Sequence, residues 1–424
     1  MGKCSRTNRH LPPNSSSICS GETDYSGATV DSDSATSAVF HSHQLYWRDL
    51  LFPLASDEFV DRRILIVGAG VSGLTTAYVL SIEGYEVVVL ADKDASQTPS
   101  VVAGALWEWP PAVCGYHSDV ESLERSKSWS AISYQRFSEL ANDPDTGVSL
   151  RKSHFYFHNP IETSDKELRK MLELRSHVAG FVHSPELIIE NGINLDLGLA
   201  DAYSYLAPVI DTEIHMEWLR EQLIQVRCPF VQRRLNGDLR DLEDDLIREF
   251  DACAIVNCAG LGARELASDA MFPLRGALVR LVNDGSSMPR VESAHCITHD
   301  ESIAEQNMIY VIPRGKDRLL VGGIAEPDEW DTEIGLANNG EVRNILDRCR
   351  RFMPALQNGV LDTTNPVSVG LRPSRKRNVR LDSEPGCRIF HNYGHGGSGF
   401  SLSWGCATEI AELVSAEKTQ PKSY

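Results

Sequence analysis

The chain has 424 residues, 42% of them hydrophobic and 24% charged, and this length is enough for the cores of two or three domains. Its formal net charge of −18 disfavours binding to nucleic acid or to an anionic membrane surface, because the average field repels phosphate. No run of about 18 apolar residues predicts a membrane span. The 10 cysteines show no CxxC pair and no metal-like spacing with histidine, which favours reduced thiols, no metal and a cytoplasmic location.

The first part of the chain, to about residue 57, is rich in Ser, Thr, Asp and His and has no sustained apolar period. This composition predicts a mostly disordered extension, with a short helix over Leu45–Leu54. The basic residues at the start precede no apolar segment, so we expect no secretory leader. The tripeptide at the end, residues 422–424, is not the usual peroxisomal signal, although a peroxisomal location stays open.

A βαβ unit follows the extension. Arg63–Val67 is an apolar, β-branched run, as expected of a strand that is buried on both faces. A glycine-rich turn at Gly68–Gly73 leads into a helical apolar period over Leu74–Ile82, and Glu86–Leu90 is a second buried strand. Strand, turn, helix and strand within about 30 residues predict a parallel sheet of the Rossmann type.

The rest of the chain alternates between helical and strand-like patterns. They predict helices over 120–140, 215–226 and 401–415, and strands over 251–257, 308–312, 318–324 and 388–391. The fold class is therefore α/β, with a discontinuous Rossmann-like domain and an inserted α+β domain on a mixed or antiparallel sheet. We assign 58–150, 225–272 and 364–424 to the first domain, and 151–224 and 273–363 to the second.

The glycine turn has the chemistry of a dinucleotide site. Gly68, Gly70 and Gly73 fit GxGxxG, in which the glycines permit a tight turn, close approach of a pyrophosphate, and close packing of helix on strand. Asp92 ends the second strand, where a carboxylate can bind ribose hydroxyls. The motif predicts a dinucleotide and leaves FAD and NAD open.

A segment near the end of the chain resembles the signature of the D-amino-acid oxidase family of flavoenzymes: His391–Ala407, HNYGHGGSGFSLSWGCA. Three further stretches are similar to that family: Val101–Trp107 to its flavin-flanking loop, Ile255–Gly260 to its returning strand, and Gly370–Arg375 to its substrate-arginine segment. The resemblance covers the chain from about residue 60 to the end. It implies that the first domain binds FAD and the second binds substrate.

The resemblance implies non-covalent FAD, with a helix that starts near Ser401 and directs its N-terminus at the pyrimidine end of the flavin. The residues expected to contact FAD are Gly68, Ala69, Gly70, Val71, Ser72, Gly73, Asp92, Lys93, Ala103, Gly104, Leu106, Leu235, Gly260, Gly396, Gly397, Gly399, Phe400 and Ser401.

The same resemblance assigns three catalytic groups. Arg372 would bind a substrate carboxylate, a task that suits its planar, two-pronged guanidinium. Tyr310 would contact the same carboxylate through its hydroxyl, and the backbone carbonyl of Gly397 would accept the substrate amine.

Four residues are expected to line the substrate space: Gln306, Glu108, Trp107 and Ser398. Two of them depart from the family. Gln306 stands where a lid tyrosine is usual, and Glu108 stands where the mammalian enzymes carry glutamine. The segment 299–306 holds three acids and no arginine, so we expect a neutral or basic substrate rather than an acidic one, with Glu108 either a partner for a cation or a solvated charge.

The predicted enzyme is an FAD-dependent oxidase that removes a hydride from the amine-bearing carbon of a D-amino acid. Its products would be an imine that hydrolyses to a keto acid and ammonia, and hydrogen peroxide from molecular oxygen. Two alternatives stay open: an FAD-dependent oxidase of a secondary amine or a specialised biosynthetic intermediate, and a non-catalytic flavin-bound protein. A homodimer is a further expectation.

Overall fold

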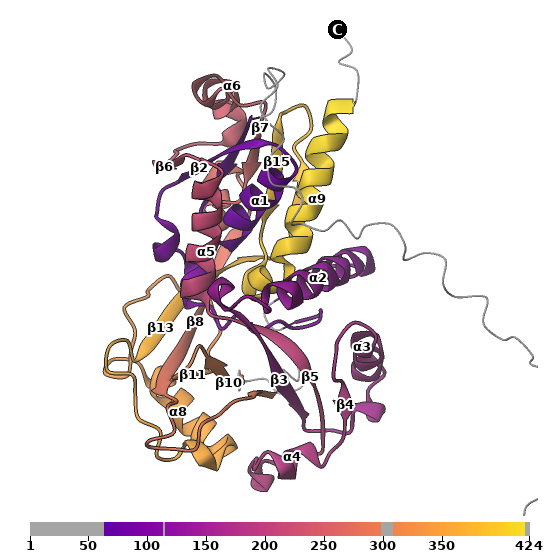
Figure 1. Ribbon diagram of the computed structural model, residues 1–424, viewed down its shortest axis with the longest axis vertical. Helices are drawn as coiled ribbons and strands as arrows, with labels where there is room; N and C mark the ends of the chain where they lie inside the picture. Colours follow the sequence, from indigo (N-terminus) through magenta and orange to yellow (C-terminus); the bar gives the residue numbers. More distant parts are fainter. Residues whose placement is uncertain (1–62, 113–114, 298–307, 420–424) are drawn as a thin grey trace, which may run out of the picture. The chain divides into compact units, whose positions relative to one another are not determined.

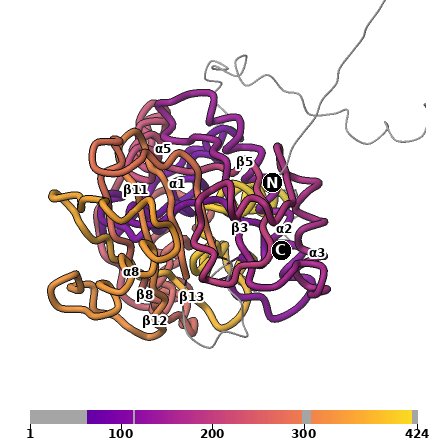
Figure 2. The backbone as a smooth tube through the Cα atoms, turned by 90° about the horizontal axis from the view of Figure 1, so that it is seen from below, coloured from indigo at the N-terminus to yellow at the C-terminus, as the bar shows by residue number. Residues whose placement is uncertain are grey.

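The computed structural model describes residues 63–112, 115–297 and 308–419, which all belong to one unit, Phe59–Tyr424 (Figures 1 and 2). These residues form two β-sheets with helices packed on both. The extension, its predicted short helix and Gln306 lie outside the described residues.

The first sheet has six strands, and all neighbouring strands are parallel except the edge pair β14–β15. In spatial order they are β14 (Arg380–Ser383), β15 (Ile389–Tyr393), β7 (Ala254–Asn257), β1 (Arg63–Val67), β2 (Glu86–Ala91) and β6 (Phe230–Gln232). The central strands are buried almost throughout, which is the reason that their sequences are continuous apolar runs.

Helices cover both faces of this sheet. Ile64 and Ile66 pack toward the helices of one face, and Leu65 toward the helix of the other, as alternation along a strand requires. The first face carries α1 (Val71–Ile82), α2 (Val120–Leu140), α5 (Thr212–Gln225) and α9 (Gly399–Thr419), and the second carries α6 (Leu239–Phe250) (Figure 1). The predicted βαβ unit is therefore the centre of this layer.

The second sheet has nine strands and is antiparallel except for the pair β3–β9. Eight follow the order β12 (Glu326–Pro327), β8 (Met271–Val282), β11 (Arg318–Gly322), β10 (Ile309–Arg314), β9 (Ala294–Ile297), β3 (Val148–Phe157), β5 (Asp201–Ile210) and β4 (Val182–His183), and β13 (Val367–Arg375) pairs with β8.

Helices α8 (Gly340–Phe352) and α3 (Asp165–Arg175) pack on this second sheet and lie at opposite ends of it (Figures 1 and 2). The short helices α4 (Leu187–Glu190) and α7 (Ala263–Leu266) complete the α-helices of the described residues. None of the helices in the described ranges is both long and apolar enough to cross a bilayer.

Several elements differ from their predicted bounds. Helix α1 begins at Val71 rather than at Leu74, directly after the glycine turn. Strand β7 begins at Ala254 rather than at Asp251, because Asp251 adopts a left-handed conformation (φ +49°) that ends α6. Helix α5 packs on α1, and β13 belongs to the second sheet, so both lie across the predicted domain boundaries. The division into two domains stays a prediction.

Candidate active site

A cavity of about 780 Å³ extends from the turn between β1 and α1 to the second sheet. Its wall combines backbone of the glycine turns with side chains of β8, β10 and β13. Such a volume suits a large organic ligand, since binding pockets for small molecules usually measure about 300–1,000 Å³. The segments that the sequence assigned to cofactor and to substrate thus share one wall.

The first glycine turn closes tightly against β7. Gly68 has φ +117°, and a Cβ there would lie 2.5 Å from the carbonyl oxygen of Cys258. A Cβ on Gly73 would lie 2.0 Å from the carbonyl oxygen of Gly68, so the start of α1 can approach β1 only with glycine at that position. Gly70 is the N-cap of α1 and makes no side-chain cap, which leaves the helix N-terminus at the cavity.

Two buried polar atoms on the wall fit a polar cofactor edge. The Nδ1 atom of His395 lies 3.3 Å from the Ser72 hydroxyl, whereas its Nε2 atom has no hydrogen-bond partner among the described residues. The Oδ1 atom of Asn392 is equally unpartnered there, although Nδ2 donates to Thr76 Oγ1 at 3.0 Å. Buried polar atoms of this kind normally find a partner, and the donors and acceptors of FAD, the cofactor predicted from the sequence, would supply one here. Burial lowers the pKa of His395 to about 4, so the ring is neutral near pH 7.

Most residues predicted to contact the cofactor lie on this wall. They are Gly68, Ala69, Gly70, Val71, Ser72, Asp92, Lys93, Ala103, Gly104, Leu106, Leu235, Gly260, Gly396, Gly397, Gly399 and Phe400. Two do not line it. Gly73 is turned into the packing between strand and helix, and the Ser401 hydroxyl accepts a hydrogen bond from the backbone N–H of Glu108 at 3.3 Å. The contacts of all these residues with FAD stay predictions.

A buried arginine at the far end of β10 fixes the loop that flanks the cavity. Nη2 of Arg314 donates to the carbonyl oxygens of Ala103 and Gly104, each at 2.7 Å. Nη1 donates to Thr212 Oγ1 at 3.0 Å, and that hydroxyl donates to the Val101 carbonyl at 2.6 Å. Arg314 is only 1% exposed. The second sheet thereby sets the position of the loop, a role of Arg314 that no sequence pattern predicted.

Arg372 lies on β13 opposite Leu274 of β8 and faces the cavity. Its Nη1 donates to the carbonyl of Ile324 at 3.1 Å, and it forms no ion pair within the described part of the chain. A Cβ on Gly276 would lie 2.3 Å from that Nη1. Gly276 therefore makes room for the guanidinium. Glycine inside a strand often marks such a close approach, so this residue could have been found from the sequence.

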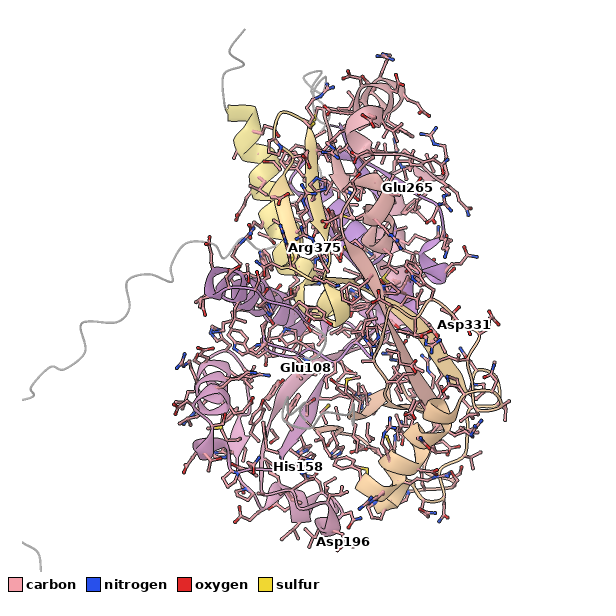
Figure 3. All side chains as sticks on the ribbon, turned by 180° about the vertical axis from the view of Figure 1, so that it is seen from behind. Glu108, His158, Asp196, Glu265, Asp331 and Arg375 are labelled. Carbon is pink, nitrogen blue, oxygen red and sulfur yellow. The ribbon has the colours of Figure 1, made fainter. Side chains whose placement is uncertain are left out.

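Glu108 lies at the boundary between the two sheets, held in place by its neighbours (Figure 3). Trp107 is fully buried, and its indole N–H donates to the Ser130 carbonyl at 3.1 Å. Trp109 stacks on His177 at 4.5 Å between ring centroids. With both tryptophans packed, the carboxyl group of Glu108 reaches the cavity wall and hydrogen-bonds with Tyr310.

Burial raises the pKa of Glu108, while the positive charge of Lys170 and the hydrogen bond from Tyr310 oppose that rise. Burial in turn lowers the pKa of Lys170, against the attraction of Glu108. Lys170 lies on α3 and donates to the carbonyl of Pro111 at 2.7 Å. Glu108 is partly buried on the cavity wall, near the charge of Lys170 and the hydroxyl of Tyr310, and both roles, partner for a cation and solvated charge, stay predictions.

Two of the predicted substrate-lining residues do not reach the cavity. Trp107 packs between Tyr134 and Tyr205, with centroid distances of 4.8 and 6.1 Å, and has no exposed surface. Ser398 is buried in the short turn of helix Gly396–Ser398 and does not line the wall. Large aromatic side chains favour the core for the area that they bury, which explains the place of Trp107.

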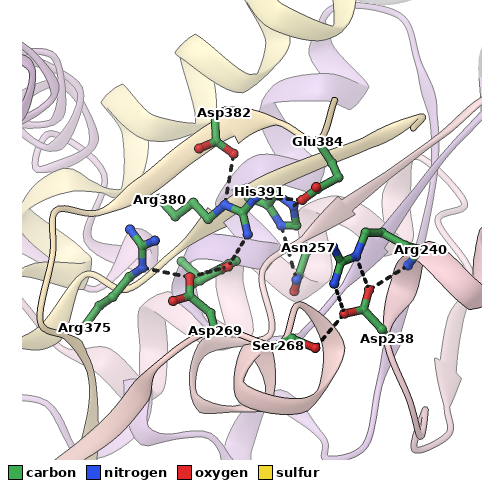
Figure 4. Close-up of polar contacts among 11 residues, drawn as sticks. Asp238, Arg240, Asn257, Ser268, Asp269, Arg375, Arg380, Asp382, Glu384 and His391 are labelled. Carbon is green, nitrogen blue, oxygen red and sulfur yellow. Dashed lines mark hydrogen bonds and ion pairs between the residues drawn. The ribbon is translucent and has the colours of Figure 1, made fainter. Parts of the chain in front are cut away.

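A polar network joins the substrate strand to the first sheet (Figure 4). Asp269 Oδ2 accepts from Arg375 Nε on β13 and from the Tyr393 hydroxyl on β15, both at 2.8 Å. Arg380 then links the Tyr393 hydroxyl, at 3.0 Å, to Glu384, at 2.7 Å. Since Arg375 is three residues from Arg372, the network sets the position of the segment that is predicted to bind a carboxylate relative to β15.

The family model described as FAD dependent oxidoreductase matches residues 63–413. A D-amino-acid oxidase of Rubrobacter xylanophilus is 35% identical over 361 residues, covering 84% of this chain and 96% of that protein. A D-amino-acid oxidase of Streptomyces coelicolor is 34% identical over 364 residues, covering 85% and 98%. A human D-aspartate oxidase is 29% identical over 365 residues, covering 83% and 94%.

Solved structures share the fold at lower identity. The glycine oxidase of Geobacillus kaustophilus superposes with a TM-score of 0.66 at 17% identity, covering 85% of this chain and 96% of that one.

Proposed function

Because the chain belongs to the FAD-dependent oxidoreductase family, we propose that it oxidises D-amino acids at the amine-bearing carbon, neutral and basic ones in preference to acidic ones. The family relation, the FAD cofactor and the oxidoreductase class that the sequence predicted are confirmed by that match and by the related D-amino-acid oxidases. The choice of substrate is carried by one observation. Arg372, which has no carboxylate partner in the described residues, lies on the same cavity wall as the glycine segment 394–399.

Catalysis rests on orientation. FAD, when bound, supplies the acceptor for the hydride. Arg372 holds the substrate carboxylate through two parallel hydrogen bonds, and Tyr310 contacts the same group. The carbonyl of Gly397 accepts from the amine and so fixes the face of the carbon that reacts. The expected products are a keto acid and ammonia after hydrolysis of the imine, with hydrogen peroxide where oxygen takes up the electrons.

The side-chain preference follows from the rest of the wall, to which Leu106, Leu278, Met308 and Ile312 contribute apolar surface. Among the described residues Glu108 is the acidic group at this end, and its negative charge disfavours a second carboxylate on the substrate. Lys170 does not line the cavity and is engaged by Glu108 and a backbone carbonyl, so it does not offset that effect. Neutral side chains fit best, and basic ones gain attraction whenever Glu108 is ionised.

The test is an anaerobic titration of the purified holoprotein. D-valine and D-lysine should bleach the flavin band near about 450 nm, with D-aspartate slower and L-valine inactive. Bleaching by N-methylglycine alone would favour a secondary-amine oxidase instead. Failure of every amino acid and amine to bleach a protein that carries FAD would contradict the proposal and favour a non-catalytic flavoprotein.

A further inference from the structure

Asn392 presents a buried oxygen to the cavity, and its neighbours fix the direction of its hydrogen bonds. The side chain lies on β15, is fully buried and lines the cavity wall. Thr76 on α1 donates its one hydroxyl hydrogen to the carbonyl oxygen of Ser72 at 2.6 Å, so toward Asn392 it can only accept. The amide of Asn392 must therefore direct Nδ2 at Thr76 Oγ1, at 3.0 Å, and Oδ1 away from it.

The Oδ1 atom of Asn392 has no hydrogen-bond partner among the described residues. An amide oxygen only accepts hydrogen bonds, so the missing partner is a donor. The oxygens of a pyrophosphate carry no hydrogen near pH 7 and do not qualify. His395, a second residue of the wall with an unpartnered atom, gives no such information, because the bond between its Nδ1 and the Ser72 hydroxyl can run in either direction. Asn392 thus states which kind of group it binds.

The order of the strands places Asn392 on the flavin side of a bound dinucleotide. The glycine turn predicts the pyrophosphate at the N-terminus of α1, next to β1, and the adenosine ribose at Asp92, directly after β2. Strand β2 lies on one side of β1, whereas β7 and then β15 lie on the other. The second half of the dinucleotide must therefore run toward the carboxyl end of β15, where Asn392 lies. In FAD that half begins with the ribityl chain, which carries hydroxyl groups.

We infer that Asn392 binds FAD by accepting a hydrogen bond from a ribityl hydroxyl group through its Oδ1 atom. Thr76 is then a positioning residue, because it holds the amide in the orientation that presents this oxygen to the cavity. Asn392 is not among the cofactor contacts that the sequence predicted. Its role requires FAD, the cofactor of the family to which the chain belongs, and does not depend on the identity of the substrate.

The experiment compares the affinities of FAD and of ADP for the full-length protein after removal of its flavin. ADP carries the adenosine and the pyrophosphate of FAD and lacks the ribityl chain. Flavin fluorescence reports the binding of FAD, and competition with FAD reports the binding of ADP. Asn392→Leu keeps the size of the side chain and removes its oxygen. We expect its affinity for FAD to fall about tenfold and its affinity for ADP to stay unchanged.

Variants of α1 make the test specific. Thr75→Val removes a buried hydroxyl that has no partner among the described residues and does not line the cavity, so it should change neither affinity. Thr76→Val removes the oxygen that orients the amide and should weaken FAD binding about threefold, whereas Thr76→Ser keeps that oxygen and should bind FAD normally. Equal FAD affinities of these two variants would overturn the role of Thr76.

An Asn392→Leu protein with the natural affinity for FAD would overturn the inference. An equal loss of affinity for FAD and for ADP would overturn it as well, because the ribityl chain would then not be the part that Asn392 binds.

FAD analogues that each lack one ribityl hydroxyl group test the same contact from the side of the ligand. The analogue without the hydroxyl that contacts Asn392 should bind the natural protein about tenfold more weakly than FAD does, and Asn392→Leu should bind both equally. If every analogue binds the natural protein as tightly as FAD, the inference is wrong even where Asn392→Leu does not fold. Turnover of D-amino acids plays no part in these measurements, so their outcome is independent of the proposed substrate.

Discussion

The two ends of the cavity are built in different ways. We name the two ends, nucleotide and substrate, for their predicted ligands. The nucleotide end consists largely of backbone from the two glycine segments 68–73 and 394–399. A Cβ on Gly68 or Gly73 would lie only 2.0–2.5 Å from a carbonyl oxygen. The substrate end consists of side chains from β10, β13 and the loop after residue 105, with partners on β8 and α3. The nucleotide end therefore leaves no space for a side chain at Gly68 or Gly73. The substrate end depends instead on contacts between side chains from different elements.

The largest effect on FAD binding is expected at the nucleotide end. Gly70→Val places a branched side chain at the N-terminus of α1, where a Cβ already lies 3.3 Å from Ser100 Oγ, and it should weaken FAD binding by about 100-fold or more. The purified protein should lack the flavin spectrum. Gly335→Ala, where nothing lies within 4 Å of a Cβ, is the matched control and should bind FAD normally. A yellow Gly70→Val protein of normal affinity would show that the pyrophosphate lies elsewhere.

Gly276→Ala should impair the substrate end of the cavity and leave the nucleotide end intact. Its methyl group would occupy the place of the Arg372 guanidinium, with 2.3 Å between Cβ and Nη1, so the arginine has to move. We expect kcat/KM for D-valine to fall by about 100-fold, or about 3 kcal/mol, while FAD affinity stays unchanged. Steady-state kinetics and an FAD titration on the same preparation measure both. Equal losses of kcat/KM and of FAD affinity would mean that Gly276 affects both ends of the cavity and not the substrate end alone.

Arg314→Met tests the connection between the ends. Loss of the guanidinium leaves the carbonyls of Ala103 and Gly104 without their buried donor, at a cost of about 3 kcal/mol in the free energy of unfolding. FAD affinity should fall about tenfold as the flanking loop loosens. Urea denaturation and an FAD titration check these values against Arg248→Met on the exposed side of α6, which should change neither. A stable Arg314→Met protein with normal FAD affinity would show that Arg314 does not hold the flanking loop in place.

The smallest effect on FAD binding and activity is expected from the face of the second sheet that points away from Glu108. There the rings of His154 and His295 stack at 4.9 Å, and burial lowers their pKa values to about 4 and about 3. An unfolded histidine has a pKa of about 6.5, so unfolding takes up protons below that pH. The stability that the neutral rings contribute is complete above about pH 6.5 and is lost as the pH falls toward 4.

Urea denaturation at a series of pH values measures this loss, which amounts to about 3 kcal/mol for His154. His154→Gln should reduce the number of protons taken up on unfolding at acidic pH by about one, and so make the free energy of unfolding depend less steeply on pH. His158→Gln, in the turn after β3, is the control and should retain the natural slope. An unchanged slope in His154→Gln would show that this histidine is not the group that titrates.

The sequence predicted the first end far better than the second, for a physical reason. A parallel strand buried on both faces must be apolar, and a helix that meets a pyrophosphate needs glycine, so β1, α1 and β2 follow from local rules. Helix α2 was predicted with its observed bounds for a similar reason, since one apolar stripe packs against α9. The long strands β3, β5 and β8 were not predicted, because polar residues interrupt their apolar runs and their partners are distant in sequence. Only the second half of β3 is buried, whereas β5 and β8 are buried almost throughout.

At the second end, Arg372 and Tyr310 came from the family resemblance. The partners of these residues did not, because Gly276, Arg314 and Lys170 matter only through contacts that tertiary structure creates. Trp107 was expected on the wall, and its size placed it in the core instead.

The proposed mechanism depends above all on Arg372, which is to bind the substrate carboxylate in the same cavity as FAD. The most direct test is the rate of anaerobic flavin reduction by D-valine and by L-valine in the natural protein and in Arg372→Leu. Loss of a charged hydrogen-bonding partner of this kind costs about 4 kcal/mol, so the account predicts a rate with D-valine about a thousandfold lower at limiting substrate, normal FAD content, and no reduction by L-valine in either protein. Reduction of Arg372→Leu at the natural rate would contradict the claim.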